Sequence, residues 1–166
     1  MALIPVYRFY NELRRAHFYF TSEHKKDKII RACRELRYEG IIFFVETVKD
    51  DSTIAVYKFF NNRNRTYIYT INENEKNNII ANYNEFSYEG IDFYVYKEFA
   101  SELLTPVYRF YNKSMNSHLY TASFDEAFHI INAYSAEYIY EGRSFYAVDK
   151  DKVSDISPEE VQSLNV

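Results

Sequence analysis

The 166 residues include three glycines, three prolines, one cysteine and no tryptophan. A lone cysteine cannot form an internal disulfide, and Cys33 lies at an apolar helical position, which predicts a buried structural thiol. No apolar run is long enough for a membrane span, and the first residues lack a charged-then-apolar signal segment. We therefore expect no membrane span, and the missing leader leaves a cytoplasmic location open.

The motifs that carry catalysis are also missing. There is no glycine-rich loop for phosphate and no nucleophile elbow. The histidines have no metal-ligand spacing on one helix; they are His17, His24, His118 and His129. Three recurring glutamates suggest acid–base work, but an active site rarely appears in triplicate in one small domain; they are Glu39, Glu89 and Glu141. We predict no enzyme activity, no metal and no cofactor.

The charge and the aromatic content narrow the class of partner. A net charge of −4 without a concentrated basic surface argues against nucleic acid. The basic residues near 25–34 are interpreted as a solvated helix surface. Aromatic residues reach 19%, with 18 tyrosines and 14 phenylalanines. Tyrosine suits both recognition surfaces and half-buried strands, so either origin is open.

A unit of about fifty residues occurs three times. The openings at residues 5–11, 55–61 and 106–112 match at offsets of 50 and 101. The closings also match; they are Tyr38-Glu39-Gly40, Tyr88-Glu89-Gly90 and Tyr140-Glu141-Gly142. All three glycines of the protein thus share one position, which predicts a special backbone conformation at a tight turn or bulge.

Each unit predicts strand, strand, helix and strand. In the first unit the strands are expected at 6–10, 17–20 and 41–45, and the later units close with strands at 91–95 and 144–148. The helices of the second and third units start with capping boxes, formed by Asn72 with Glu75 and by Ser123 with Glu126. Lys25 breaks the box after Ser22.

These units predict one α+β domain over residues 1–150, built from three tandem strand–strand–helix–strand repeats at about 5–50, 55–100 and 106–148 in a pseudo-threefold arrangement. We expect residues 151–166 to form a short tail, and the sequence at 157–160 is typical of a helix start. We expect the following side chains to be buried: Phe9, Phe59, Phe110, Ile30, Ile80 and Ile131.

The motifs Pro-Val-Tyr-Arg-Phe-Tyr-Asn, His-Phe-Tyr-Thr and Tyr-Glu-Gly resemble the units of a bacterial repeat family of unknown function, over about residues 5–148. The resemblance implies an accessory module joined to extracellular or surface proteins, and hence an extracellular or cell-surface location. It supplies no ligand. The second unit departs from the pattern at Ala55, Lys58, Phe60 and Tyr67.

The recurring Arg8, Lys58 and Arg109 have two interpretations. They either pair with the glutamate of each closing motif or bind a ligand, and we favour the pairing. A shallow sugar site would combine aromatic faces with amides and imidazoles. The candidate ligand-binding residues are Arg8, Tyr10, Asn11, His17, Tyr19, Arg109, Tyr111, Asn112, His118 and Tyr120. The alternative is that the asparagines begin turns and the histidines are structural.

We therefore expect a non-catalytic, lectin-like module that recognises carbohydrate or a cell-envelope polymer through repeated aromatic sites. The alternative is a protein–protein interaction module such as a secreted effector, an inhibitor or a specificity factor.

Overall fold

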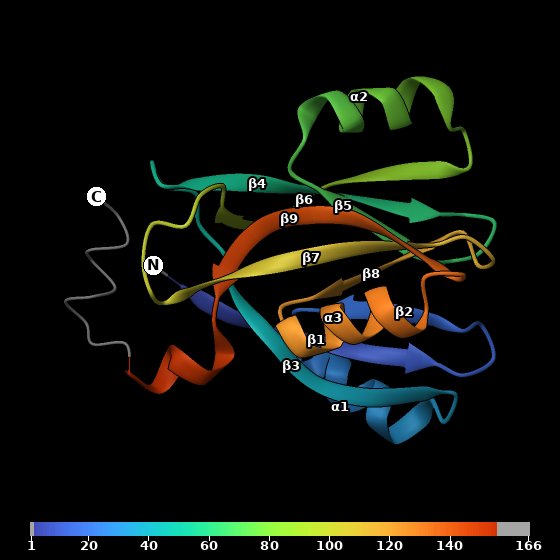
Figure 1. The fold of residues 1–166 in the computed structure, drawn as a ribbon, viewed down its shortest axis with the longest axis horizontal. Helices are drawn as coiled ribbons and strands as arrows, with labels where there is room; N and C mark the ends of the chain where they lie inside the picture. The colour runs from blue at the N-terminus through green and yellow to red at the C-terminus, as the bar shows by residue number, and fades with distance from the viewer. Residues whose placement is uncertain (1, 156–166) are drawn as a thin grey trace.

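The computed structural model describes residues 2–155, which form an α+β fold of nine strands and three α-helices (Figure 1). The first segment contains β1 (Leu3–Asn11), β2 (Ala16–Phe20), α1 (Glu23–Ala32) and β3 (Leu36–Glu46). The second contains β4 (Thr53–Asn61), β5 (Tyr67–Thr70), α2 (Glu73–Asn82) and β6 (Phe86–Tyr96). The third contains β7 (Leu104–Asn112), β8 (Ser117–Thr121), α3 (Phe124–Ala133) and β9 (Tyr138–Val148), and a 3-10 helix, η1 (Lys150–Asp155), follows.

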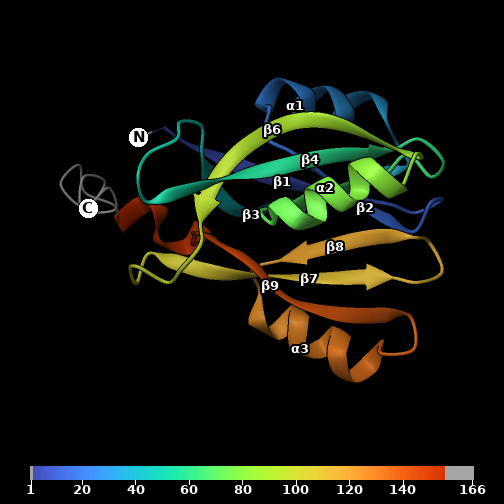
Figure 2. The same cartoon turned by 90° about the horizontal axis from the view of Figure 1, so that it is seen from above.

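All nine strands belong to one sheet. In each segment the first strand lies between the other two and pairs antiparallel with both. The closing strands β3, β6 and β9 also pair with one another. The three helices lie apart on the outside of the sheet (Figure 2). Strand pairing between segments therefore runs through the closing strands.

The closing strands begin earlier than predicted, before the Tyr-Glu-Gly motif rather than after it, at Leu36, Phe86 and Tyr138. The glycines therefore lie within strands and not at turns. Their φ angles are +102°, +93° and +96° for Gly40, Gly90 and Gly142. The register between β1 and β3 shifts on both sides of the Arg8–Gly40 pair. This confirms a bulge with a backbone that disfavours other residues.

The helix starts agree with the sequence, but the buried helix face does not. Ser22, Asn72 and Ser123 accept the backbone N–H three residues on, as N-caps do. The prediction that Ile30, Ile80 and Ile131 are buried is wrong, because they are 51%, 55% and 44% exposed. Their neighbours one residue earlier are buried instead; they are Ile29, Ile79 and Ile130. Consecutive helical residues lie about 100° apart, so a single-layer contact buries only one of the two.

The core has a central cluster and smaller clusters beneath the helices. Valines and phenylalanines of all three segments meet in the centre. The smaller clusters contain Phe9, Phe59 and Phe110, which are at most 1% exposed, as predicted. Cys33 is half-buried at the end of α1 and packs against one of these clusters. Hydrophobic burial in three similar clusters thus fixes each helix on its own segment.

At the C-terminal side, η1 follows β9 directly, and β1 begins at the same end of the sheet (Figure 1). The helix start predicted at residues 157–160 lies outside the described residues. The helices between residues 2 and 155 are ten residues or fewer, and none could cross a membrane.

Candidate functional site

Three tyrosines join the segments at the centre of the molecule. The Tyr19 hydroxyl donates to the Tyr120 carbonyl at 3.2 Å, the Tyr120 hydroxyl to the Tyr69 carbonyl at 2.7 Å, and the Tyr69 hydroxyl to the Tyr19 carbonyl at 3.4 Å. Burial raises the pKa of all three phenols. Their exposure is 5% or less, so Tyr19 and Tyr120 cannot stack on a sugar, and we drop them as ligand contacts.

The recurring arginines also join segments. The Arg8 Nε donates to Glu39 at 2.9 Å, and its Nη atoms donate to both oxygens of Glu126, at 2.6 and 2.7 Å. Glu39 is the predicted partner, and this pairing is confirmed. Glu126 belongs to the third segment. Burial disfavours the charge of Arg8, but the bond to Glu126 and the charges of Glu126 and Glu39 contribute in the opposite direction, and the pKa of Arg8 is raised. Arg8 therefore has a structural partner at each terminal nitrogen.

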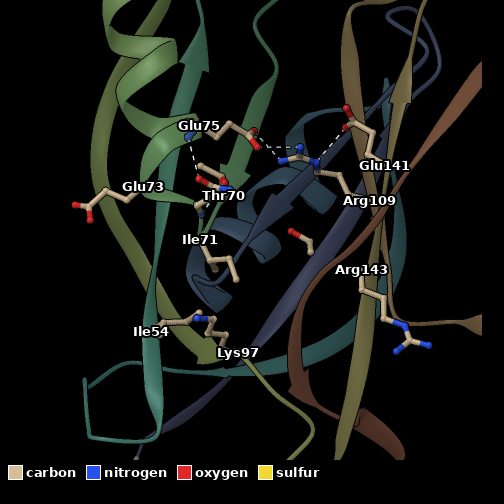
Figure 3. Close-up of a pocket in the computed structure, with 11 residues that line it drawn as sticks. Ile54, Thr70, Ile71, Glu73, Glu75, Lys97, Arg109, Glu141 and Arg143 are labelled. Carbon is tan, nitrogen blue, oxygen red and sulfur yellow. Dashed lines mark hydrogen bonds and ion pairs between the residues drawn. The ribbon is translucent and has the colours of Figure 1, made fainter.

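Arg109 repeats this geometry between the third and second segments (Figure 3). Its guanidinium lies between Glu141, 3.0 Å from Nε, and Glu75, which accepts bonds of 2.9 and 3.1 Å. The Glu75 side chain thus leaves the predicted capping box. The backbone N–H of the N-cap residue Asn72 donates instead to the Thr70 hydroxyl. In the third segment the backbone N–H of Ser123 likewise donates to the Thr121 hydroxyl. Half of each predicted capping box therefore forms. The cap side chain accepts the backbone N–H of the glutamate, but the glutamate side chain binds an arginine of a neighbouring segment.

The boundary between the second and first segments lacks this arginine–glutamate pair. Lys58 takes the position of the arginine and lies 4.0 Å from Glu89 and 3.5 Å from Asp92. Lys25 takes the position of the glutamate. Burial and the charge of Lys58 lower the pKa of the Lys25 ammonium. This boundary therefore brings two cations together where the other two boundaries carry ion pairs.

The predicted asparagines are turn residues. The Asn11 side chain accepts the Arg14 N–H at 2.9 Å, and the Asn112 side chain accepts the Ser114 and Met115 N–H groups at 3.1 Å. Exposures of 6% and 1% leave little of either amide for a ligand. The interpretation of these residues as turn initiators is the one that the structure favours.

The remaining predicted residues form two half-buried pairs. The ring centroids of Tyr10 and His17 are 4.9 Å apart, and those of Tyr111 and His118 are 5.2 Å apart. Each imidazole Nε2 lies near a closing glutamate, at 3.3 Å from Glu39 and 3.2 Å from Glu141.

Burial raises the pKa of Glu39, but the bond from His17 and the charge of Arg8 outweigh it, and its pKa falls to about 2. The pKa of Glu141 is lowered in the same way, with His118 and Arg109 opposing burial. Both glutamates therefore stay ionised and orient the imidazoles at neutral pH.

The Tyr111–His118 pair forms one wall of a cavity of about 450 Å³ between the second and third segments, which we call the second–third groove. The other wall comes from α2 and the start of β6, with Asn78, Ile79 and Tyr83. The Tyr111 hydroxyl donates to the Asn116 side chain at 3.0 Å, which orients the ring. The groove thus combines two tyrosines with amides and an imidazole.

The cavity drawn in Figure 3 is lined by the same ion-paired side chains, Glu75, Arg109 and Glu141, and measures about 520 Å³. Two further cations of this cavity, Lys97 and Arg143, lie apart from the ion pairs (Figure 3). Aromatic side chains are absent from its lining. The second–third groove is therefore the stronger candidate for recognition of a ring-shaped ligand.

A second groove occupies the corresponding place between the first and second segments and measures about 360 Å³; we call it the first–second groove. Phe60 and Tyr67 stand where the other segments have tyrosine and histidine, with ring centroids 5.1 Å apart. The facing wall comes from α1 and the start of β3, with Lys25, Ile29 and Leu36.

The boundary between the third and first segments is crossed by an ion pair. Arg15 follows the turn after β1 and lies 2.9 Å from Glu137, which precedes β9. Arg15, Arg65 and Asn116 all have positive φ angles, of 49°, 61° and 48°, so they hold one position in the three turns. This position holds arginine in the first two segments and asparagine in the third, so only the second–third boundary lacks a cation there.

Among residues 2–155, no three histidine, cysteine or acidic side chains come together as metal ligands would. The family description "Domain of unknown function (DUF5648)" matches residues 3–151. The chain belongs to this family. No curated protein and no solved structure matches the chain. Family membership therefore agrees with the resemblance to an uncharacterised family and assigns no activity to the grooves.

Sequence reasoning missed half of the second–third groove. Tyr111 and His118 were expected near a ligand, but Asn78 and Tyr83, which face them, were not. Tyr10 and His17, also expected near a ligand, line neither groove. The missing signal was the order in which segments meet. The sequence did contain one signal. The position of Glu75 and Glu126 is a lysine, Lys25, in the first unit, and the position of the recurring arginines is also a lysine, Lys58, in the second unit. These two substitutions fall at the same boundary between segments.

Proposed function

We propose that this chain is a non-catalytic carbohydrate-binding module that holds a sugar ring in the second–third groove. We further propose that its three segments are copies of one repeat around a pseudo-threefold axis, so that grooves arise where copies meet. The interpretation rests on one observation: Tyr111 and Tyr83 line a single open groove together with amide and imidazole groups.

The chemistry of the groove suits a neutral sugar. An aromatic face contacts the apolar face of a pyranose, and Asn78 and Asn116 offer amides to its hydroxyls. Tyr83 is 46% exposed, so its ring is accessible from solvent. The Nε2 of His118 faces Glu141, which leaves the rest of the imidazole to line the groove. Open sites of this kind bind weakly, with Kd values of about 0.1–1 mM.

Screening against an array of neutral and acidic glycans tests this proposal, followed by calorimetry with the best neutral ligand. Tyr111→Ala should weaken binding about tenfold or more, because it removes the ring that Asn116 orients. The matched control is Phe99→Ala, which removes an aromatic ring that is 52% exposed and lies outside the groove. Unchanged affinity in Tyr111→Ala, or no neutral glycan on the array, would reject the proposal.

A protein-interaction module is the second candidate, and one surface favours it. On α3, Phe124, Phe128 and Ile131 are 66%, 59% and 44% exposed, and the two phenylalanine rings stack at 6.0 Å. The corresponding strips of α1 and α2 are largely polar, beginning with Glu23 and Glu73. Glycan binding that survives Phe128→Ser but is lost in Tyr111→Ala would favour the sugar over a protein partner.

A further inference from the structure

The first–second groove and the second–third groove are matched in place but differ in charge. Phe18, Ile29 and Leu36 of the first are in the places of Ile68, Ile79 and Phe86 of the second, so the apolar walls are alike. The polar rim is not alike. The second–third groove has Glu75, Glu85 and Glu141 with one arginine, Arg109. The first–second groove has Arg14, Lys25 and Arg65 with one glutamate, Glu35.

Two of these cations form no ion pair within residues 2–155, namely Lys25 and Arg65. Glu35 lines the same groove, and the charges of Glu89 and Asp92 act on Lys25 across the boundary. Both cations lie over aromatic rings instead. The Lys25 Nζ is 4.2 Å from the Phe20 ring centroid, and the Arg65 Cζ is 5.6 Å from that of Phe60. These contacts hold the charges at the groove without neutralising them.

The substitutions that create this charge occur together. Where the third segment has Tyr111 bonded to Asn116, the second has Phe60 beneath Arg65. Three residues after the N-cap, α2 and α3 have a glutamate, whereas α1 has Lys25. Arg65 holds the turn position that Arg15 holds in the first segment, where the arginine forms an ion pair with Glu137. In the first–second groove Arg65 lies over Phe60 and forms no ion pair, so its charge faces the groove and can attract an anion.

We propose that the first–second groove binds an anionic saccharide, with a carboxylate between Lys25 and Arg65 and the sugar ring against Phe60 and Tyr67. This inference rests on the proposed function and refines it, because it assigns acidic sugars to one groove and neutral sugars to the other. Arg14, whose guanidinium donates to the Asn64 carbonyl, closes the end of the groove and adds a third positive charge.

Two sugars that differ only at C6 test the assignment: methyl β-glucuronide carries a carboxylate where methyl β-glucoside carries a hydroxymethyl group. We would follow backbone amide signals of the labelled protein by NMR during titration of each. The glucuronide should shift signals around Lys25, Phe60 and Arg65, with about three- to tenfold tighter binding there than the glucoside. Added salt should weaken that binding and leave glucoside binding unchanged. Acetate, the anion alone, should shift these signals little.

The matched variant is Lys25→Glu with Arg65→Asn, which gives the first–second groove the residue types of the second–third groove. It should lose the preference for glucuronide while glucoside binding near Tyr111 persists. Lys49→Glu with Lys113→Asn changes the net charge equally at exposed sites that line neither groove, and should behave as the parent.

The outcomes separate the two proposals. Glucoside shifts near Tyr111 without glucuronide shifts near Lys25, or an unaffected double variant, overturn the anionic groove alone. Acetate that binds as well as glucuronide overturns recognition of the sugar in this groove. If neither sugar shifts any groove signal, the carbohydrate-binding function itself fails.

Discussion

The Tyr120 hydroxyl lies 2.7 Å from the carbonyl oxygen of Tyr69 and 2.8 Å from its backbone nitrogen. One buried phenol therefore satisfies both backbone groups of a residue in another segment. Tyr120→Phe should lower the free energy of unfolding by about 1–3 kcal/mol, because it leaves buried polar groups unsatisfied. Tyr69→Phe should cost less, since its bond to the Tyr19 carbonyl is long, at 3.4 Å.

Urea denaturation measures both variants. Tyr134→Phe is the control, because Tyr134 is 47% exposed and its hydroxyl makes no bond within residues 2–155. Equal losses in Tyr69→Phe and Tyr120→Phe would contradict the role given to these bonds.

Glu126→Gln should destabilise the protein, because it removes the negative charge that faces Arg8. The side chain of Arg8 is only 9% exposed, so its guanidinium would remain largely buried without that partner. The carboxylate itself is 34% exposed, so solvent screening reduces the loss to about 1–3 kcal/mol. Glu98→Gln is the control, an exposed carboxylate without an ion pair in the described chain. Thermal unfolding of the two variants measures the difference, and equal melting temperatures would show that the pair adds no stability.

Stability should fall with acid because of Glu39. Its folded pKa of about 2 is below the ordinary value of 4.5, with His17 and Arg8 outweighing burial. A depressed carboxyl pKa contributes stability that is fully present above the unfolded pKa and is lost as the pH falls from about 4.5 toward 2. The free energy of unfolding of Glu39→Gln should therefore be lower near pH 6 and depend less on pH below 4.5. Parallel pH curves for parent and variant, measured by urea denaturation, would refute this.

Gly90→Val should cost about 1–3 kcal/mol through backbone strain alone. The φ angle is +93°, and a β-carbon at this position has no other atom within 4 Å, so the β-carbon itself causes no steric overlap. Gly90→Asn should cost less, because asparagine tolerates positive φ better than a β-branched residue. Guanidinium denaturation compares the two. A larger loss with asparagine than with valine would show that the conformation is not the cause.

Sequence reasoning succeeded where the cause lies within one segment. The shared position of Gly40 and its two counterparts predicted an unusual backbone, and the pairing of Arg8 with Glu39 followed from their recurrence. It failed where two segments meet. A capping box is a local pattern, so nothing near Glu126 in the sequence signals that its carboxylate binds Arg8. The choice of Ile30 over Ile29 failed for a related reason, since periodicity alone does not say which edge of an apolar strip faces the sheet.

The closing strands have a further consequence at the end of the sheet where β1 begins and β9 ends. Leu3 packs on the same cluster as Val148, with Tyr96 and Leu104. A short linker across that cluster, with a break in the loop at residues 47–52 or 97–103, would yield a circularly permuted chain with the same sheet. Such a chain would begin with a different segment. The three segments would still follow one another in the same direction around the centre, because the tyrosine bonds run from the first to the third, from the third to the second and from the second to the first.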